Sequence, residues 1–151
     1  MTSDSFSGDG LASDINAAMA QAKSFKASGV DIIDVGGEST RPGSAPVSVD
    51  EELERVVPVI HQLVKATDLP ISVDTYKSAV AKEALSAGAS MINDVWGLKH
   101  DPRVAELAAE NGVPIVLMHN QWGTDYHDLV GEVLKSLRQS MQIACERGVP
   151  R

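Results

Sequence analysis

The chain has 151 residues, of which 13 are Lys or Arg and 21 are Asp or Glu, so its formal net charge is −8. This length can bury one core, and an acidic chain without a basic tract argues against nucleic acid and membrane surfaces as partners. The sequence contains no apolar run long enough to span a bilayer and no signal peptide. A single cysteine, Cys145, cannot form an internal disulfide, which predicts a cytoplasmic location.

The N-terminal third predicts a loop, a helix, a strand and a second loop. Residues 2–10 are small, polar and Gly-containing, as in a loop, and apolar residues at helical spacing then predict a helix to about Ser28. A β-branched run from Val30 predicts a buried strand. Gly36 and Gly37 end that strand, because glycine marks a turn or a close approach of the backbone.

The rest of the chain repeats one pattern, a short apolar strand followed by an amphipathic helix. Ser48 and Glu51 form a capping box at the start of one helix, and Thr75 is expected to cap the next. Asp101 followed by proline predicts a third helix start. In chain order, the predicted elements are strand 30–35, helix 48–64, strand 70–75, helix 75–87, strand 90–95, helix 101–111, strand 114–119 and helix 129–144.

Alternating strands and helices imply a parallel sheet with right-handed crossovers. A barrel of eight such units takes about 250 residues, roughly 30 for each unit, so this chain would hold about half to five-eighths of one. A complete doubly wound sheet is the alternative, but it concentrates its site at one switch point, whereas here polar residues follow every strand. We therefore expect α/β architecture with residues 1–151 forming one incomplete (β/α)8 TIM barrel domain.

Polar side chains at the strand ends form the candidate site. Thr40 and Arg41 offer a hydroxyl and a fixed cation, a pair suited to phosphate. Asp74 can accept two hydrogen bonds from a flat ring edge rich in N–H groups, and Asn93 offers both a donor and an acceptor. Two structural alternatives are equally open: Asp74 as a helix cap, and Asn93 as a buried amide that pairs with the backbone.

Alternation along a strand separates neighbouring side chains. If Asn93 faces the barrel axis, Asp94 faces away and is expected to anchor a loop. In the same way, Met118 and His119 cannot both face the axis of a regular strand. Methionine suits packing on a flat heterocycle, whereas His119 would be the choice for a base or a metal ligand. A metal site built from His119 and the strand-end acids lacks any tight ligand spacing.

Several runs resemble the dihydropteroate synthase family, in the order in which that family carries them. The second catalytic loop of the family resembles Gly36-Gly37-Glu38-Ser39-Thr40-Arg41-Pro42-Gly43. Its first loop, Asn-x-Thr-Pro-Asp-Ser-Phe-Ser, is similar to the N-terminal residues, with matches at Thr2, Asp4, Ser5, Phe6 and Ser7. Its pterin-contacting strand ends resemble Ser72-Val73-Asp74-Thr75 and Ile92-Asn93-Asp94-Val95, and its fifth strand resembles Leu117-Met118-His119.

The resemblance implies a transferase of folate biosynthesis. Such an enzyme condenses 6-hydroxymethyl-7,8-dihydropterin pyrophosphate with para-aminobenzoate, and releases 7,8-dihydropteroate and pyrophosphate. Thr40 and Arg41 would be catalytic residues on the pyrophosphate or aminobenzoate side, and Asp74, Asn93 and Met118 would bind the pterin. The further loop elements would be Asp4, Ser5, Phe6, Ser39 and Pro42. The family is commonly dimeric and uses Mg²⁺, whose usual Asn would lie before Met1.

The resemblance also implies that the chain holds strands two to five of the barrel, without the first strand and the last three. We therefore expect the isolated chain to show no turnover, and its open sheet edges and interior to favour aggregation or partner pairing. One alternative is a pterin-binding methyltransferase, which would share the Asp and Asn strand ends but lack the Glu-Ser-Thr-Arg-Pro-Gly run. The other is a degenerate, non-catalytic barrel that acts as a binding or partner subunit.

Overall fold

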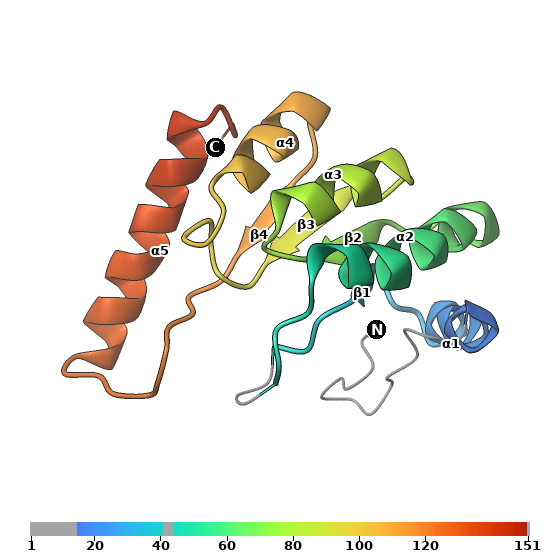
Figure 1. Ribbon diagram of the computed structural model, residues 1–151, viewed down its shortest axis with the longest axis horizontal. Helices are drawn as coiled ribbons and strands as arrows, with labels where there is room; N and C mark the ends of the chain where they lie inside the picture. Colours follow the sequence, from blue (N-terminus) through green and yellow to red (C-terminus); the bar gives the residue numbers. More distant parts are fainter. Residues whose placement is uncertain (1–14, 41–43, 151) are drawn as a thin grey trace.

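Helices and strands alternate along the computed structural model of the chain, which describes residues 15–40 and 44–150 (Figure 1). Residues 1–14, 41–43 and 151 lie outside the described part, and with them the expected loop elements Asp4, Ser5, Phe6 and Pro42 and the expected catalytic residue Arg41. The elements are α1 (Ile15–Ala27), β1 (Ile33–Gly36), α2 (Val49–Ala66), β2 (Ile71–Asp74), α3 (Ser78–Ser86), β3 (Met91–Asp94), α4 (Arg103–Asn111), β4 (Ile115–Leu117) and α5 (Leu129–Glu146).

The four strands form one parallel sheet in the order β1-β2-β3-β4. Each strand pairs with the one before it in the chain, so the order contains no reversal. A doubly wound sheet requires such a reversal at its switch point, whereas a barrel adds every strand beside its predecessor. The strand order therefore agrees with the expected part of a barrel and disagrees with the doubly wound alternative.

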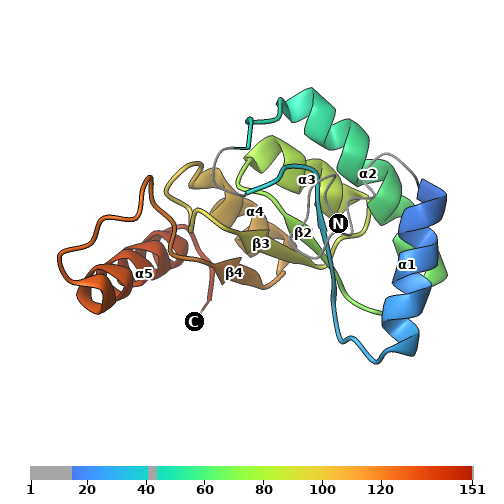
Figure 2. The same ribbon diagram turned by 90° about the horizontal axis from the view of Figure 1, so that it is seen from below.

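The helices cover one face of this sheet and leave the other face open. In Figure 1, α2, α3 and α4 lie along one side of the strands, and Figure 2 shows α1 and α5 at opposite ends of this layer. The core lies between sheet and helices, and its strand residues are Ile33, Val35, Ile71, Val73 and Ile92. No helix of residues 15–40 and 44–150 covers the other face, which in a closed barrel would be the interior.

The expected cap of α2 is present, because the Ser48 hydroxyl accepts from the Glu51 N–H at 3.2 Å. The expectation that Thr75 caps α3 was wrong. The Thr75 N–H still donates to the Asn93 carbonyl at 3.1 Å, so the backbone there remains paired with β3 and cannot yet turn into a helix. The helix begins three residues later, at Ser78.

Asp101 lies one residue further from its helix than expected, since α4 begins at Arg103. It still serves as a cap, because its Oδ1 accepts from the Arg103 N–H at 3.2 Å. Its Oδ2 accepts from the Ser78 N–H at 3.0 Å. One carboxylate therefore satisfies N–H groups at the starts of both α3 and α4, groups that would otherwise have no partner within their helices.

The last helix, α5, buries few of its residues. Its expected apolar stripe is largely exposed, and within it only Ala144 is buried, next to the buried Ser140. The exposed members are Leu129, Val130, Leu134 and Met141. No helix in the described part of the chain has the length and apolar character needed to cross a membrane.

Candidate functional site

The strand-end residues Asp74 and Asn93 lie side by side on the open face of the sheet. They are direct register partners of the β2–β3 pair, and directly paired residues on neighbouring strands point to the same face. The Asn93 amide donates from Nδ2 to Oδ2 of Asp34, on β1, at 3.2 Å. Three polar side chains from three successive strands therefore meet at one place.

The Asp74 carboxyl has a perturbed acidity. Burial and the negative charge of Asp34 raise the pKa of Asp74 from 3.8 to about 7, because both effects disfavour a second anion there. Near neutral pH this carboxyl can therefore hold or release a proton. A perturbed acid beside a hydrogen-bonding amide is typical of a binding or catalytic site.

Asp94 has a different role from its neighbour. Its side chain is fully buried on the helix-covered side, and its two oxygens accept from the Trp96 and Leu98 N–H groups, each at 2.8 Å. Burial raises the pKa of Asp94 although the amide hydrogen bonds oppose this. The carboxyl anchors the turn after β3, as the alternation of side chains predicts.

Met118 and His119 follow the end of β4 at Leu117. The Met118 N–H donates to the Asp94 carbonyl at 3.2 Å, so pairing with β3 continues, and the side chain is 43% exposed. His119 instead approaches Tyr126, with 3.0 Å between its Nε2 and the hydroxyl oxygen. The His119 Nδ1 is buried and has no hydrogen-bond partner within the described part of the chain.

Thr40 and Ser39 belong to what we call the β1–α2 segment, which consists of the described residues 37–40 and 44–48. Thr40 is exposed, and the Ser39 carbonyl accepts from the Ser44 hydroxyl at 2.5 Å. The segment begins in close contact with α2. A Cβ on Gly37 would lie 2.8 Å from Glu52 Cγ and 2.9 Å from Val56 Cγ2. Only glycine permits this approach, and Gly36 beside it pairs with Asp74.

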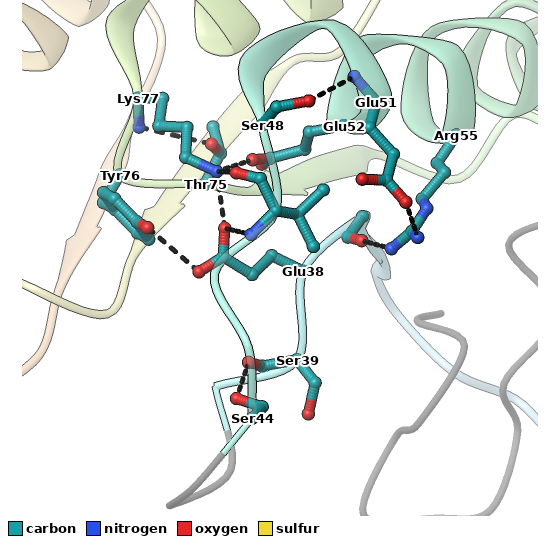
Figure 3. A network of polar contacts seen from close by, with 12 residues as sticks. Glu38, Ser39, Ser44, Ser48, Glu51, Glu52, Arg55, Thr75, Tyr76 and Lys77 are labelled. Atoms are coloured by element: carbon teal, nitrogen blue, oxygen red, sulfur yellow. Dashed lines mark hydrogen bonds and ion pairs between the residues drawn. The ribbon is translucent and has the colours of Figure 1, made fainter.

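A buried ionic network holds the base of the β1–α2 segment (Figure 3). The Lys77 ammonium donates to Glu38 Oε2 at 2.5 Å, to Glu52 Oε2 at 2.5 Å and to the Val47 carbonyl at 2.7 Å. Glu38 also accepts from the Tyr76 hydroxyl at 2.9 Å and from the Val47 N–H at 3.3 Å. The network therefore joins both ends of the segment to the starts of α2 and α3.

The protonation states in this network follow from its charges. Burial alone would lower the pKa of Lys77, but the hydrogen bonds that its ammonium donates to Glu38 and Glu52 outweigh burial, and the pKa is raised. Burial and the hydrogen bond to Glu38 raise the pKa of Tyr76 to about 12. The lysine is therefore a cation and the tyrosine a neutral donor at neutral pH.

Sequence reasoning gave no role to Glu38, Glu52, Tyr76 or Lys77. Two signals could have identified them. Glu52 lies on the same buried helix face as Val56, where a carboxylate requires a partner. The other signal is the position of Lys77, three residues after Asp74 in the run Asp-Thr-Tyr-Lys.

A cavity of about 680 Å³ opens beside these strand ends. Its lining includes Ser39, Thr40, Tyr76, Trp96, His119 and Trp122. The Tyr76 ring lies 4.5 Å from the His100 ring, and Trp96 lies 5.1 Å from Trp122, measured between ring centroids. Asp74 and Asn93 do not line the cavity because they lie on the open sheet face next to it. Tyr76, two residues after Asp74, connects the two areas.

The family model described as pterin binding enzyme matches residues 1–151. Dihydropteroate synthase of Bacillus subtilis is 54% identical over 149 residues, which cover 99% of this chain and 52% of that protein. The chain thus spans about half the length of the curated relatives it matches.

Solved structures agree with the sequence comparison. The crystal structure of dihydropteroate synthase from Clostridium difficile in the presence of pteroic acid is similar with a TM-score of 0.87 and 45% identity, over 91% of this chain and 52% of that one. The Xanthomonas albilineans dihydropteroate synthase with 4-aminobenzoic acid is similar with a TM-score of 0.87 and 43% identity, over 98% and 54%. The likeness identifies the four-stranded sheet as part of a TIM barrel.

Proposed function

Since the chain belongs to the family of pterin-binding enzymes, we propose that it is part of a dihydropteroate synthase. Such an enzyme condenses 6-hydroxymethyl-7,8-dihydropterin pyrophosphate with para-aminobenzoate, forming 7,8-dihydropteroate and releasing pyrophosphate. Support comes from the relatives that bear this name at 54% and 48% identity. Further support comes from similar synthases crystallised with pteroic acid and with 4-aminobenzoic acid.

One observation carries the proposal: Asp74 and Asn93 pair in register where the β1–α2 segment leaves the sheet. In the proposed complex, the Asp74 carboxylate accepts two N–H groups from the edge of the pterin ring. Asp34 takes a donor of the Asn93 amide, so the Asn93 oxygen is left to accept from the ligand. Met118 would pack against the flat ring.

Thr40 and Arg41 are proposed to act on the other half of the substrate. Departing pyrophosphate carries several negative charges, and a guanidinium with a nearby hydroxyl stabilises such charge in a dry site. Thr40 lines the cavity beside the strand ends that are proposed to bind the pterin, which supports a role for its hydroxyl between the two substrates. Ser39, also on the cavity wall, would support this part of the segment.

Magnesium, a homodimeric parent and a cytoplasmic location belong to the same proposal. The described residues include no group of three or more His, Cys, Asp or Glu able to hold a metal ion, so the acids of the open face do not form a metal centre by themselves. Location in the cytoplasm is supported by the single cysteine.

Titration calorimetry with 6-hydroxymethyl-7,8-dihydropterin tests the proposed pterin site. We expect the chain to bind the pterin, and Asp74→Ala or Asn93→Ala to weaken binding by about tenfold or more, because each removes hydrogen bonds to a buried ring edge. Asp31→Ala, a change at an exposed aspartate just before β1, is the matched control and should leave the affinity unchanged.

The same titration separates the alternative functions. A chain that binds no pterin would contradict the proposal and favour the degenerate barrel that serves as a partner subunit. The methyltransferase alternative is disfavoured by the Glu-Ser-Thr-Arg-Pro-Gly run of residues 38–43. It would be favoured if methyltetrahydrofolate bound and inorganic pyrophosphate did not.

A further inference from the structure

We propose that Lys77 is a positioning residue, which holds the β1–α2 segment at a fixed position relative to the pterin-binding end of β2. The inference rests on the proposed function, because that function makes the segment the carrier of the pyrophosphate-side residues Thr40 and Arg41. Lys77 itself is not one of the residues proposed to contact either substrate. It acts through Glu38, near the start of the segment, and Val47, near its end.

The geometry of the ammonium group carries the first step. An ammonium has three N–H donors, and Lys77 has three acceptors: Glu38 Oε2 and Glu52 Oε2, each at 2.5 Å, and the Val47 carbonyl at 2.7 Å. The side chains of Lys77, Glu38 and Glu52 are 14%, 12% and 1% exposed. A group with all donors used, inside a nearly dry site, has one preferred position.

The second step is that the contacts close the segment at its base. Glu38 lies near its start and Val47 near its end, and the Val47 N–H donates to the Glu38 carboxylate at 3.3 Å. Lys77 then bonds both residues from outside the segment. Figure 3 shows these groups converging on the lysine from the segment and from α2. The described residues next to these two ends, including Thr40, are therefore held at the base of the segment.

A second cation shows why Lys77 has a distinct role. Arg55 donates from Nη1 to the Gly37 carbonyl at 2.7 Å and also pairs with Glu51. Both Arg55 and Glu51 belong to α2, the helix that directly follows the segment. Lys77 instead lies three residues beyond Asp74, so in this network it is the cation that ties the segment to the pterin-binding strand.

Removing the cation has a local consequence. Glu38 and Glu52 would face each other with little water and no positive charge, a situation that proteins avoid by opening or by taking up protons. Glu52 is held in the buried face of α2, whereas Glu38 is attached to the segment. The segment is therefore the part that would move. Because the lysine's hydrogen bonds reach no group of β3, β4 or α4 among the described residues, those elements should be unaffected.

Hydrogen exchange measured by mass spectrometry tests this inference without requiring turnover. In the Lys77→Met chain, peptides spanning residues 37–48 should exchange at least about tenfold faster than in the wild type, whereas peptides from β3 and α4 should not change. Lys77→Arg keeps the charge and should recover most of the protection. Lys26→Met breaks an exposed ion pair with Asp68 and serves as the matched lysine control, with no expected change at residues 37–48.

A second variant with a smaller expected effect keeps the inference testable if Lys77→Met does not fold. Glu52→Gln keeps the side-chain size and removes one charge, so the same peptides should exchange faster to a smaller extent. Unchanged exchange at residues 37–48 in both variants would overturn the inference. So would acceleration of equal size in every peptide, because that result describes general destabilisation instead of positioning.

Binding of inorganic pyrophosphate provides a readout that a purely structural lysine would not affect. Lys77→Met should weaken pyrophosphate binding by about tenfold or more, and Lys77→Arg should restore it. Thr40→Ala should weaken binding while leaving exchange unchanged. A wild-type chain that binds no pyrophosphate would count against the proposed function, whereas the exchange result decides the role of Lys77 by itself.

Discussion

Three aspartates in this chain show how the surroundings of a side chain decide its chemistry. Asp74 has its pKa raised to about 7 by burial beside Asp34. Asp94 is buried among backbone N–H groups and anchors a turn. Hydrogen bonds from Arg103 and Ser78 lower the pKa of Asp101, although burial would raise it. Only Asp74 combines a shifted pKa with a place on the open face, which makes it the functional candidate.

The raised pKa of Asp74 predicts a pH-dependent stability. Because the folded pKa of about 7 exceeds the ordinary 3.8, the folded chain binds more protons than the unfolded chain between these values. The free energy of unfolding should therefore fall as pH rises from 3.8 to about 7. Each pKa unit corresponds to at most about 1.4 kcal/mol. Asp74→Asn removes this dependence and should be more stable than wild type at pH 8, by up to a few kcal/mol.

Urea unfolding at pH 5 and pH 8 measures the effect. Asp31→Asn, at an exposed position, should follow the wild-type pH dependence and controls for the loss of one negative charge. Parallel pH profiles for Asp74→Asn and wild type would contradict the assigned pKa.

At the scale of elements, the turn after β3 is where three elements meet. Gly97 has φ +57°, and a Cβ there would lie 2.6 Å from the Met118 carbonyl oxygen and 2.6 Å from Ser140 Oγ. Leu98 beside it also has a positive φ of 66°, held by its N–H bond to Asp94. The turn thereby connects the end of β3 to the residues after β4 and to α5, which has few other contacts with the layer.

Two glycine substitutions, one in this turn and one at the end of α4, separate backbone strain from close contact. Gly112 ends α4 with a similar φ of +63° and has nothing within 4 Å of its would-be Cβ. Gly112→Ala should therefore cost about 1 kcal/mol of unfolding free energy, the strain of a left-handed residue alone. Gly97→Ala should cost at least about twice as much, because the methyl group also meets fixed atoms. Equal losses in chemical unfolding would argue against the close approach.

At the scale of the whole molecule, the helices protect one side of the sheet only. Val116 on the last strand is 46% exposed and Met118 beyond it is 43% exposed, and Val116 pairs with Asn93 on the open face. Apolar side chains beside an unpaired strand edge favour association, since pairing buries the apolar area and satisfies backbone groups. The surface that the proposed function uses for pterin is thus also a surface that favours self-association.

Sedimentation velocity over a range of protein concentrations checks this expectation. The wild-type chain should associate as its concentration rises, and Val116→Lys should shift it toward monomer, because a charge on the edge strand opposes pairing. Val64→Lys places the same charge at an exposed position of α2 on the helix side and should not alter association. A wild-type chain that stays monomeric at all concentrations would refute the prediction.

Much of the fold followed from sequence patterns alone. Short β-branched runs alternate with amphipathic stretches, and this alternation predicted a parallel sheet and its strand positions within a few residues. The placement of Asp74 beside Asn93 was also predictable, because carboxyl ends of parallel strands meet at one edge and side chains alternate along each strand. The separation of Asn93 from Asp94 follows from the same geometry.

The sequence did not determine features that depend on distances between separate elements. It placed a cap at Thr75, although pairing with β3 keeps that residue in the sheet, and it assigned no partner to Lys77. The lysine meets Glu38 and Glu52, 39 and 25 residues away, only when α2 and α3 pack side by side. Local propensity and alternation are properties of neighbouring residues, so they determined the strands and their polar ends. The ionic network and the pKa of Asp74 depend on burial and on charges brought from other strands, and therefore only the tertiary structure decided them.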